Sequence, residues 1–219
     1  VDALVSLGSA EKSPAIEPQG QPLSAQTRRQ FFAPESVAII GASGTPGKAG
    51  HEVIRNILAN DYAGKLYLVS PKGGEILGMP VYPSVADLPE VVDLAVVIIP
   101  ANLTVPAVRE CAAKGIGAMV LAAGGFSEVD EAGERLQQEL AEVISDTGIR
   151  VLGPNTSGHT STPHHFTSTF FPQGKIPRGN ISYIAQTGNF ATHTMRYIAT
   201  GENFGVARLR QRVFNENST

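Results

Sequence analysis

The sequence predicts an α/β fold in which a mostly parallel sheet is covered by helices on both faces. Short apolar runs rich in β-branched residues alternate with longer helical stretches, as expected where each parallel strand is followed by a crossover helix. A glycine-rich turn joins the first of these strands to the first long helix. The composition, with 42% hydrophobic and 17% charged residues, is that of a folded globular chain. In such folds, ligands bind at the carboxyl ends of the strands.

The individual elements follow from periodicity. The predicted strands are short and apolar, whereas the predicted helices carry apolar residues on one face, as Val53, Ile54 and Ile57 do in the first long helix. We expect strands at residues 37–40, 65–69, 94–99, 119–122, 150–152 and 181–185, and helices at residues 47–59, 104–114, 131–146 and 189–200.

Changes in composition along the chain predict four segments. Residues 1–32 mix Pro, Gln, Ser and Gly without a period, so we expect a flexible leader there. Residues 33–154 carry the alternating pattern and form the first α/β domain. Residues 155–179 are polar and turn-rich, which predicts a linker. Residues 180–219 restart with a strand and a helix, which predicts a partial second α/β domain.

The strongest local motif is the sequence VAIIGASGTPGKAG at residues 37–50. Gly41, Gly44 and Gly47 let the backbone turn sharply after a strand, and the helix that follows presents free N–H groups and a positive dipole end to a phosphate. A Walker A loop is excluded, because Ala49 stands where Ser or Thr is required after Gly-Lys. The motif predicts a Rossmann-type nucleotide site; a purely structural glycine turn is the alternative.

The residues after the second strand point away from NAD. An NAD site places an acidic side chain there to bind the ribose hydroxyls, but this chain has Ser70-Pro-Lys72-Gly-Gly. Lys72 could pair with a phosphate on the ribose or with the pyrophosphate, which suits coenzyme A (CoA), with its 3′-phosphate, or, less well, NADP. The alternative is a solvated turn lysine. Small residues and proline at residues 98–101 and 122–126 leave room for an adenine or a pantetheine arm, although ordinary turns would use the same residues.

Charge and composition exclude several classes of partner. A net charge of −3 with a pI near 6.0 predicts neither nucleic-acid binding nor an anionic membrane surface as partner. The single Cys111 cannot form an intramolecular disulfide, and we expect a cytoplasmic protein. His159, His164 and His165 have no Cys or carboxylate at ligand spacing, so we expect a polar loop and no bound metal there.

Taken in order, the motifs VAIIGAS, LVSPKGGEILGMPVY, DLAVVIIPA, VLAAGGFSE, RVLGPNTSG and ISYIAQTGNFATHTM resemble the CoA-binding subunit or domain of NDP-forming acyl-CoA synthetases. They are similar to the α subunit of succinyl-CoA synthetase. The resemblance implies a CoA-binding Rossmann domain at residues 33–154, followed by the start of a flavodoxin-like domain. The CoA contacts that it implies are Ser43, Gly44, Thr45, Pro46, Lys72, Ile99, Pro100, Ala123, Gly124 and Gly125.

The resemblance also implies a place for phosphoryl chemistry. In this family the Gly-Pro-Asn stretch and a later strand-turn-helix build the site where an acyl phosphate and a phosphohistidine meet, and here they supply Asn155, Thr187, Gly188 and Asn189. A helix N-terminus suits a phosphoryl group because it offers free N–H donors, although an ordinary N-capped helix is the alternative.

The implied function is therefore the CoA-binding portion of an acid-thiol ligase. The complete enzyme would use a Mg-nucleotide, an ATP-grasp β subunit or domain, and a phosphohistidine segment. We expect neither the ATP-grasp domain nor the phosphohistidine segment within this chain, and we expect an oligomer. Two alternatives stay open: a noncatalytic CoA-binding or CoA-sensing module, and an NADP-dependent reductase.

Overall fold

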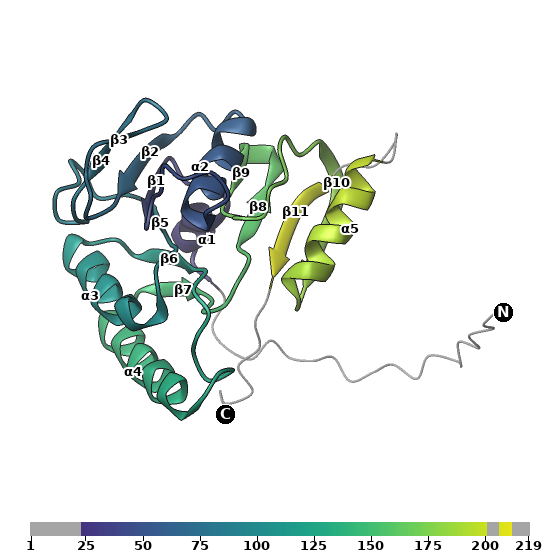
Figure 1. Cartoon of the computed structure of the whole chain (residues 1–219). Coiled ribbons are helices and arrows are strands. Elements are labelled where there is room, and N and C mark those ends of the chain that lie inside the picture. The colour runs from purple at the N-terminus through teal and green to yellow at the C-terminus, as the bar shows by residue number, and fades with distance from the viewer. Residues whose placement is uncertain (1–22, 201–205, 212–219) are drawn as a thin grey trace, which may run out of the picture.

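The computed structural model describes residues 23–200 and 206–211, which form two β-sheets and their helices (Figure 1). The larger sheet has the strand order β3-β4-β2-β1-β5-β6-β7. Its neighbouring strands are parallel, except that β3 runs antiparallel to β4. The strands are β1 (Ser36–Ile40), β2 (Lys65–Val69), β3 (Glu75–Ile76), β4 (Met79–Tyr82), β5 (Leu94–Val97), β6 (Ala118–Leu121) and β7 (Arg150–Leu152).

The central strands are apolar because both of their faces are buried. In β1, Val37 and Ile39 pack into one apolar cluster, whereas Ala38 and Ile40 pack into a second cluster on the opposite face. Helices α1 and α2 cover the first cluster, and α3 and α4 cover the second (Figure 1). The predicted α/β fold is confirmed. These helices are α1 (Ala25–Phe32), α2 (Ala49–Ala59), α3 (Thr104–Lys114) and α4 (Glu131–Thr147).

The strand order reverses at β1. After β1 the chain moves outward to β2 on one side, and it later crosses back to place β5 on the other side. In doubly wound sheets, the crevice outside the carboxyl ends of two such strands is the usual ligand site. The fold therefore predicts a ligand site at the segments that follow β1 and β5.

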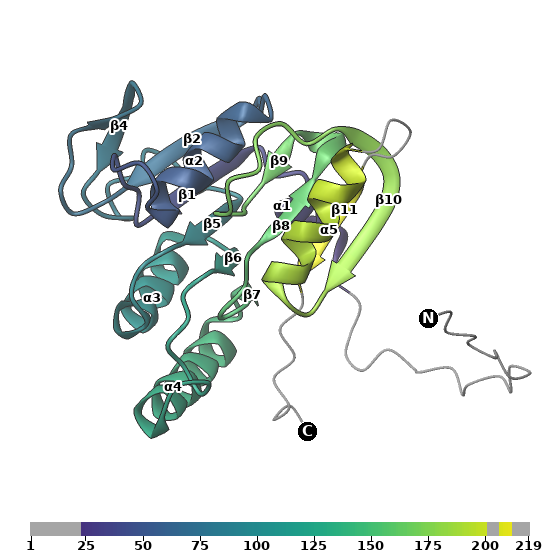
Figure 2. The same cartoon turned by 45° about the vertical axis from the view of Figure 1, so that its right-hand side comes forward.

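A smaller sheet follows, in the order β10-β11-β8-β9. Strands β10 and β11 are parallel and α5 connects them, which is the strand-helix-strand unit expected at the start of a second α/β domain (Figure 2). Strand β8 runs antiparallel to both β11 and β9. The elements are β8 (His159–Ser161), β9 (Phe166–Thr167), β10 (Arg178–Ala185), α5 (Gly188–Thr200) and β11 (Val206–Gln211).

Two segments differ from the sequence prediction. Helix α1 occupies the end of the expected leader, with the Ser24 hydroxyl capping it and Phe31 buried. The expected linker at 155–179 contains β8 and β9, whose few residues are mostly polar and show no apolar alternation to detect. The rest of the leader, residues 1–22, lies outside the described residues, as do residues 201–205 and 212–219 of the expected second domain.

Asn56 in α2 and Asn60 at its C-cap join the 155–179 segment to the helical layer of the larger sheet. The Asn56 side chain donates to the carbonyl of Thr169 at 2.9 Å. Asn60 donates to the carbonyl of Gly174 at 2.9 Å and accepts the N–H of Ile176 at 2.9 Å. Both asparagines are buried, so these bonds are shielded from competing water.

Candidate functional site

The predicted CoA contacts all follow strands of the larger sheet. Residues 43–46 follow β1, Lys72 follows β2, residues 99–100 follow β5, and residues 123–125 follow β6. Because these strands are parallel neighbours, their carboxyl ends meet at one edge of the sheet. The structure thus gathers these residues along one edge, with β1 near its middle.

The glycine-rich loop is packed tightly at its base. Gly41 has a φ of 94°, and a Cβ added there would lie 2.1 Å from the carbonyl oxygen of Ile98, which follows β5. The N–H groups of Gly41 and Ala42 both donate to the carbonyl of Val69, at 3.0 and 3.1 Å. The loop is therefore anchored to the ends of both strands that flank β1.

The first turn of α2 holds the other side of this loop. A Cβ added at Gly50 would lie 2.1 Å from the carbonyl oxygen of Gly41, so only glycine lets the helix approach this closely. The buried Glu52 accepts the N–H of Gly47 at 3.0 Å. His51 Nδ1 lies 3.2 Å from the carbonyl oxygen of Ser43 and donates to it. Sequence reasoning missed all three α2 residues, because their partners become visible only in three dimensions.

The top of the loop remains accessible. Residues 44–48 are exposed, whereas Ala42 before them and Gly50 after them are buried. Within the described part of the chain, the N-cap residue Lys48 makes no side-chain capping hydrogen bond to α2. The helix therefore presents an uncapped, positively polarised N-terminus beside an exposed loop, which is an arrangement that can bind a phosphate.

Lys72 lies where the sequence predicts it, in the exposed turn after β2. None of the ion pairs formed among the described residues includes Lys72, so no carboxylate there neutralises its ammonium group. A free cation at this position favours an anionic ligand group over the ribose hydroxyls of NAD.

The loops after β6 and β7 meet around Glu128, a residue that sequence reasoning also missed. The Glu128 carboxylate accepts the N–H of Gly125 at 2.7 Å and the side-chain amide of Asn155 at 3.3 Å. The N–H of Asn155 donates to the carbonyl of Ala123 at 2.8 Å. The structure therefore brings the expected phosphoryl-site residue Asn155 next to the expected CoA contacts of 123–125.

Hydrogen bonding sets the charge state of Glu128. Partial burial would by itself raise the pKa of this carboxyl, but hydrogen bonds from the N–H groups of Gly125, Glu128 and Phe126 outweigh it. The net result is a pKa below the ordinary glutamate value. The side chain is therefore an ionised acceptor at neutral pH and holds its donors in one arrangement.

The remaining phosphoryl-site candidates lie in the second unit. Thr187, Gly188 and Asn189 are at the N-terminus of α5, and not at the edge of the larger sheet. The Thr187 hydroxyl accepts the N–H of Phe190 at 3.3 Å, and its carbonyl accepts the N–H of Ala191 at 3.0 Å. Thr187 thus acts as an N-cap in this structure.

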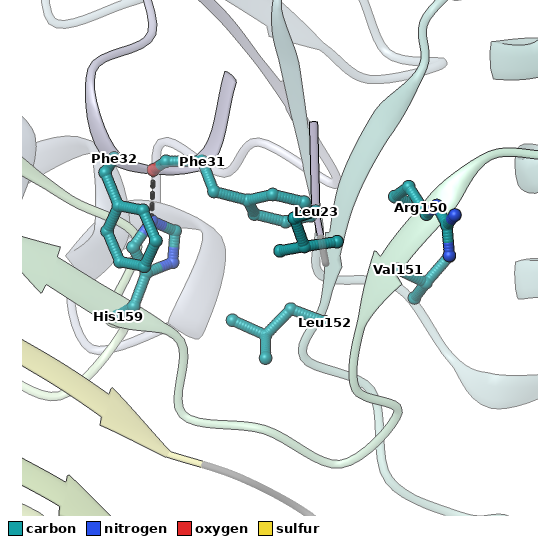
Figure 3. A pocket seen from close by; sticks show the side chains of 7 residues that line it. All are labelled: Leu23, Phe31, Phe32, Arg150, Val151, Leu152 and His159. Carbon is teal, nitrogen blue, oxygen red and sulfur yellow. Dashed lines mark hydrogen bonds between the residues drawn. The ribbon is translucent and has the colours of Figure 1, made fainter. Parts of the chain in front are cut away.

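The expected polar histidine loop is partly core. His159 is 1% exposed and stacks edge-on against Phe32, and the His159 Nε2–H donates to the Phe31 carbonyl (Figure 3). Its Nδ1 lies 3.0 Å from the Ser168 hydroxyl oxygen, so both ring nitrogens have a hydrogen-bond partner. A cavity of about 140 Å³ beside this histidine contains none of the expected CoA contacts.

Two features are absent from residues 23–200 and 206–211. No group of three or more His, Cys, Asp or Glu side chains is placed there to hold a metal ion. In the same ranges no helix combines the length and the apolar character needed to cross a bilayer.

The doubly wound sheet and the accessible glycine loop at its switch point define a nucleotide-binding domain of the Rossmann class. Residues 35–161 match the family described as "CoA binding domain". The match covers more than half of the chain, which therefore belongs to this CoA-binding domain family.

Known proteins support the same assignment. The chain is 43% identical over 162 residues to the ADP-forming acetate-CoA ligase II of Archaeoglobus fulgidus, a match of 74% of this chain and 24% of that protein. It is 40% identical to subunit alpha of the ADP-forming acetate-CoA ligase I of Pyrococcus furiosus, covering 72% of this chain and 35% of the subunit. The predicted resemblance to NDP-forming acyl-CoA synthetases is confirmed, and the matched part spans about a quarter to a third of these relatives.

A solved structure has the same fold over most of the chain. The apo acetyl-CoA synthetase 1 of Ca. Korarchaeum cryptofilum, described as dinucleotide forming, superposes with a TM-score of 0.78 at 33% identity. The likeness covers 84% of this chain and 40% of that protein. The fold of the larger sheet and of the unit that follows it is thus shared with a known synthetase.

Proposed function

We propose that this chain is the CoA-binding portion of an NDP-forming acyl-CoA synthetase. The observation that carries the proposal is the accessible glycine loop at the switch point of a chain that belongs to the CoA-binding domain family. In the complete enzyme, the CoA thiol would attack an acyl phosphate, forming the thioester and releasing phosphate. That acyl phosphate would form when a phosphohistidine transfers its phosphoryl group to the carboxylate, and ATP or GTP would phosphorylate the histidine again and leave as NDP. Overall, carboxylate, CoA and NTP would give acyl-CoA, NDP and phosphate.

In this proposal, CoA binds along the carboxyl ends of the strands of the larger sheet. The exposed loop and the N-terminus of α2 hold the pyrophosphate, Lys72 pairs with the 3′-phosphate, and the small residues after β5 and β6 leave space for the pantetheine arm. The proposed contacts are Ser43, Gly44, Thr45, Pro46, Lys72, Ile99, Pro100, Ala123, Gly124 and Gly125.

The phosphoryl group is proposed to meet Asn155 and the N-terminus of α5. Asn155 supports this role by lying beside Ala123 and Gly125, where the thiol end of CoA would emerge. At α5, Thr187, Gly188 and Asn189 offer the positive end of a helix of 13 residues. The Thr187 hydroxyl already caps that helix. The anion would therefore be bound by the backbone N–H groups at the start of α5 more than by this hydroxyl.

Other components complete the proposed enzyme. We propose an ATP-grasp β subunit or domain as partner, a Mg-nucleotide bound in that component, an oligomeric assembly and a cytoplasmic location. The partner is supported by the relative named as a subunit alpha, of which this chain covers 35%.

Calorimetric titration of this chain with CoA and with NADPH tests the ligand. We expect CoA to bind more tightly, because its 3′-phosphate and pyrophosphate reach Lys72 and the glycine loop together. NADPH also carries a ribose phosphate, so the unpaired Lys72 makes an NADP-dependent reductase the second candidate. Tighter binding of NADPH would replace the proposal with that candidate.

A second assay separates a ligase portion from a CoA sensor. The chain is combined with a purified ATP-grasp partner, and formation of ADP is followed with acetate present. ADP formation that depends on CoA supports the ligase. A chain that binds CoA and yet gives no ADP supports a noncatalytic CoA-binding module.

A further inference from the structure

A strained leucine stands at the tip of the β3–β4 hairpin. Leu77 has a φ of 51° and Gly78 a φ of 78°, so both residues of the turn lie in the left-handed region. Hairpin turns of this kind favour Asn or Gly at the first position, and a bulky residue there is a rare and costly choice. Leu77 is also 52% exposed, so burial in the core does not explain the leucine.

The hairpin is fixed beside the glycine loop. Ile76 Cγ1 lies 3.7 Å from the position that a Cβ of residue 44 would occupy. Ile76 and Met79 are directly paired across the hairpin, and both pack against the cluster that contains Ala42. Figure 2 shows this hairpin projecting from the larger sheet near the start of α2. The exposed tip therefore borders the proposed phosphate site.

The same excursion of the chain carries Lys72. Its two ends are tied together, because Ser70 N–H donates to Tyr82 carbonyl at 2.9 Å and Val81 N–H donates to Gly74 carbonyl at 2.9 Å. Lys72 and Leu77 therefore lie on one braced segment between β2 and β4.

The position of this segment in the sheet indicates which end of the ligand it would contact. In doubly wound sheets the adenosine part of a ligand lies toward the end of the second strand, and the rest of the ligand crosses the switch point in the opposite direction. The hairpin lies on the β2 side of β1, whereas β5 and β6 lie on the other side. The tip is thus on the adenosine side and away from the expected thiol end.

We propose that Leu77 packs against the adenosine end of bound CoA, and that the strained turn is retained because the ligand uses this side chain. The inference rests on the proposed CoA function. It assigns an apolar specificity contact to the β3–β4 hairpin, in addition to the proposed phosphate contacts of the glycine loop and Lys72. Strained residues that persist without a packing role are concentrated at ligand contacts.

The test substitutes Leu77→Asn, because Asn is at home in the left-handed turn and lacks the apolar side chain. Binding of three probes is measured by calorimetry: CoA, adenosine 3′,5′-bisphosphate and 4′-phosphopantetheine. We expect about tenfold weaker binding of the first two, from loss of apolar contact area. Binding of 4′-phosphopantetheine and the melting temperature should not fall.

The matched control is Val91→Asn. Val91 is 55% exposed and precedes β5. It therefore lies at the amino ends of the strands, opposite the proposed ligand site, and this variant should bind all three probes normally. Unchanged CoA binding by Leu77→Asn overturns the inference, as does a loss confined to 4′-phosphopantetheine or a lowered melting temperature. If the unsubstituted chain binds no CoA, the proposed function fails first and this inference fails with it.

Discussion

The carboxylate of Glu128 joins the loop after β6 to the loop after β7, because its Oε1 lies 3.3 Å from the side-chain nitrogen of Asn155. The same oxygen accepts the N–H of Gly125 at 2.7 Å. One ionised side chain thus orders both an expected CoA contact and an expected phosphoryl-site residue. The ionised carboxylate thus adds to the backbone hydrogen bond between Asn155 and Ala123, which joins the same two loops.

The Glu128 contact predicts a pH-dependent stability difference. Because the folded-state pKa is lowered, its contribution is present above the unfolded-state pKa and is lost as the pH falls through the folded-state pKa. We expect Glu128→Gln to be less stable than the unsubstituted chain at pH 7, and the gap in melting temperature to close in acid. A gap that widens on acidification would contradict this interpretation.

Gly50→Ala should damage the phosphate loop. The added Cβ would meet the Gly41 carbonyl, a backbone atom that cannot rotate away, so we expect a loss of about 1–3 kcal/mol in the free energy of unfolding. CoA binding should weaken with it, as measured by urea denaturation and calorimetry.

The control for this variant is Gly148→Ala at the end of α4. Gly148 has a φ of 68° but open space around it, so the substitution adds strain of about 1–2 kcal/mol without touching the loop. Both variants should lose stability, and only Gly50→Ala should lose CoA affinity. Equal CoA affinity in the two variants would show that the Gly41–Gly50 contact has no role in binding.

Lys72→Glu should weaken CoA binding by about tenfold or more, because it removes a charge-assisted contact and adds repulsion. Dephospho-CoA, which lacks the 3′-phosphate, should be much less affected. Arg135→Glu makes the same change of charge on the exposed face of α4 and should bind CoA normally. If the substitution weakens the binding of CoA and of dephospho-CoA equally, Lys72 does not contact the 3′-phosphate.

Asn60→Ala should loosen the segment after β9. The substitution removes the side-chain partner of the exposed Gly174 carbonyl and of the buried Ile176 N–H, and the buried N–H left unsatisfied costs about 1–3 kcal/mol. Hydrogen exchange of the peptide that contains Ile176 should become faster. Unchanged exchange there would mean that Asn60 does not fasten this segment.

The larger sheet was predictable because its signals are local. Alternate residues of β1 face two apolar clusters, so an uninterrupted apolar run appears in the sequence, and Gly41 follows it directly. The β3–β4 hairpin was not predicted, because strands of two and four residues containing Pro80 give no alternation to detect. Helix α1 was missed for a similar reason: its stability depends on burying Phe31 against the sheet.

The candidate site was predictable only in part. The positions of the glycine loop and of Lys72 follow from strand ends, which sequence periodicity locates. Gly50, Glu52 and Glu128 act on atoms that are near in space, through close approach to Gly41 or through hydrogen bonds to loop amides. A residue whose role depends on such a partner has no signature of its own in a single sequence.

A crystal structure of the chain with CoA tests the central claim most directly. We predict that the pyrophosphate of CoA contacts the N–H groups of the loop at residues 43–46, with Lys72 at the 3′-phosphate and the thiol end near Gly125. A structure in which CoA binds elsewhere and leaves this loop without a phosphate would contradict the account.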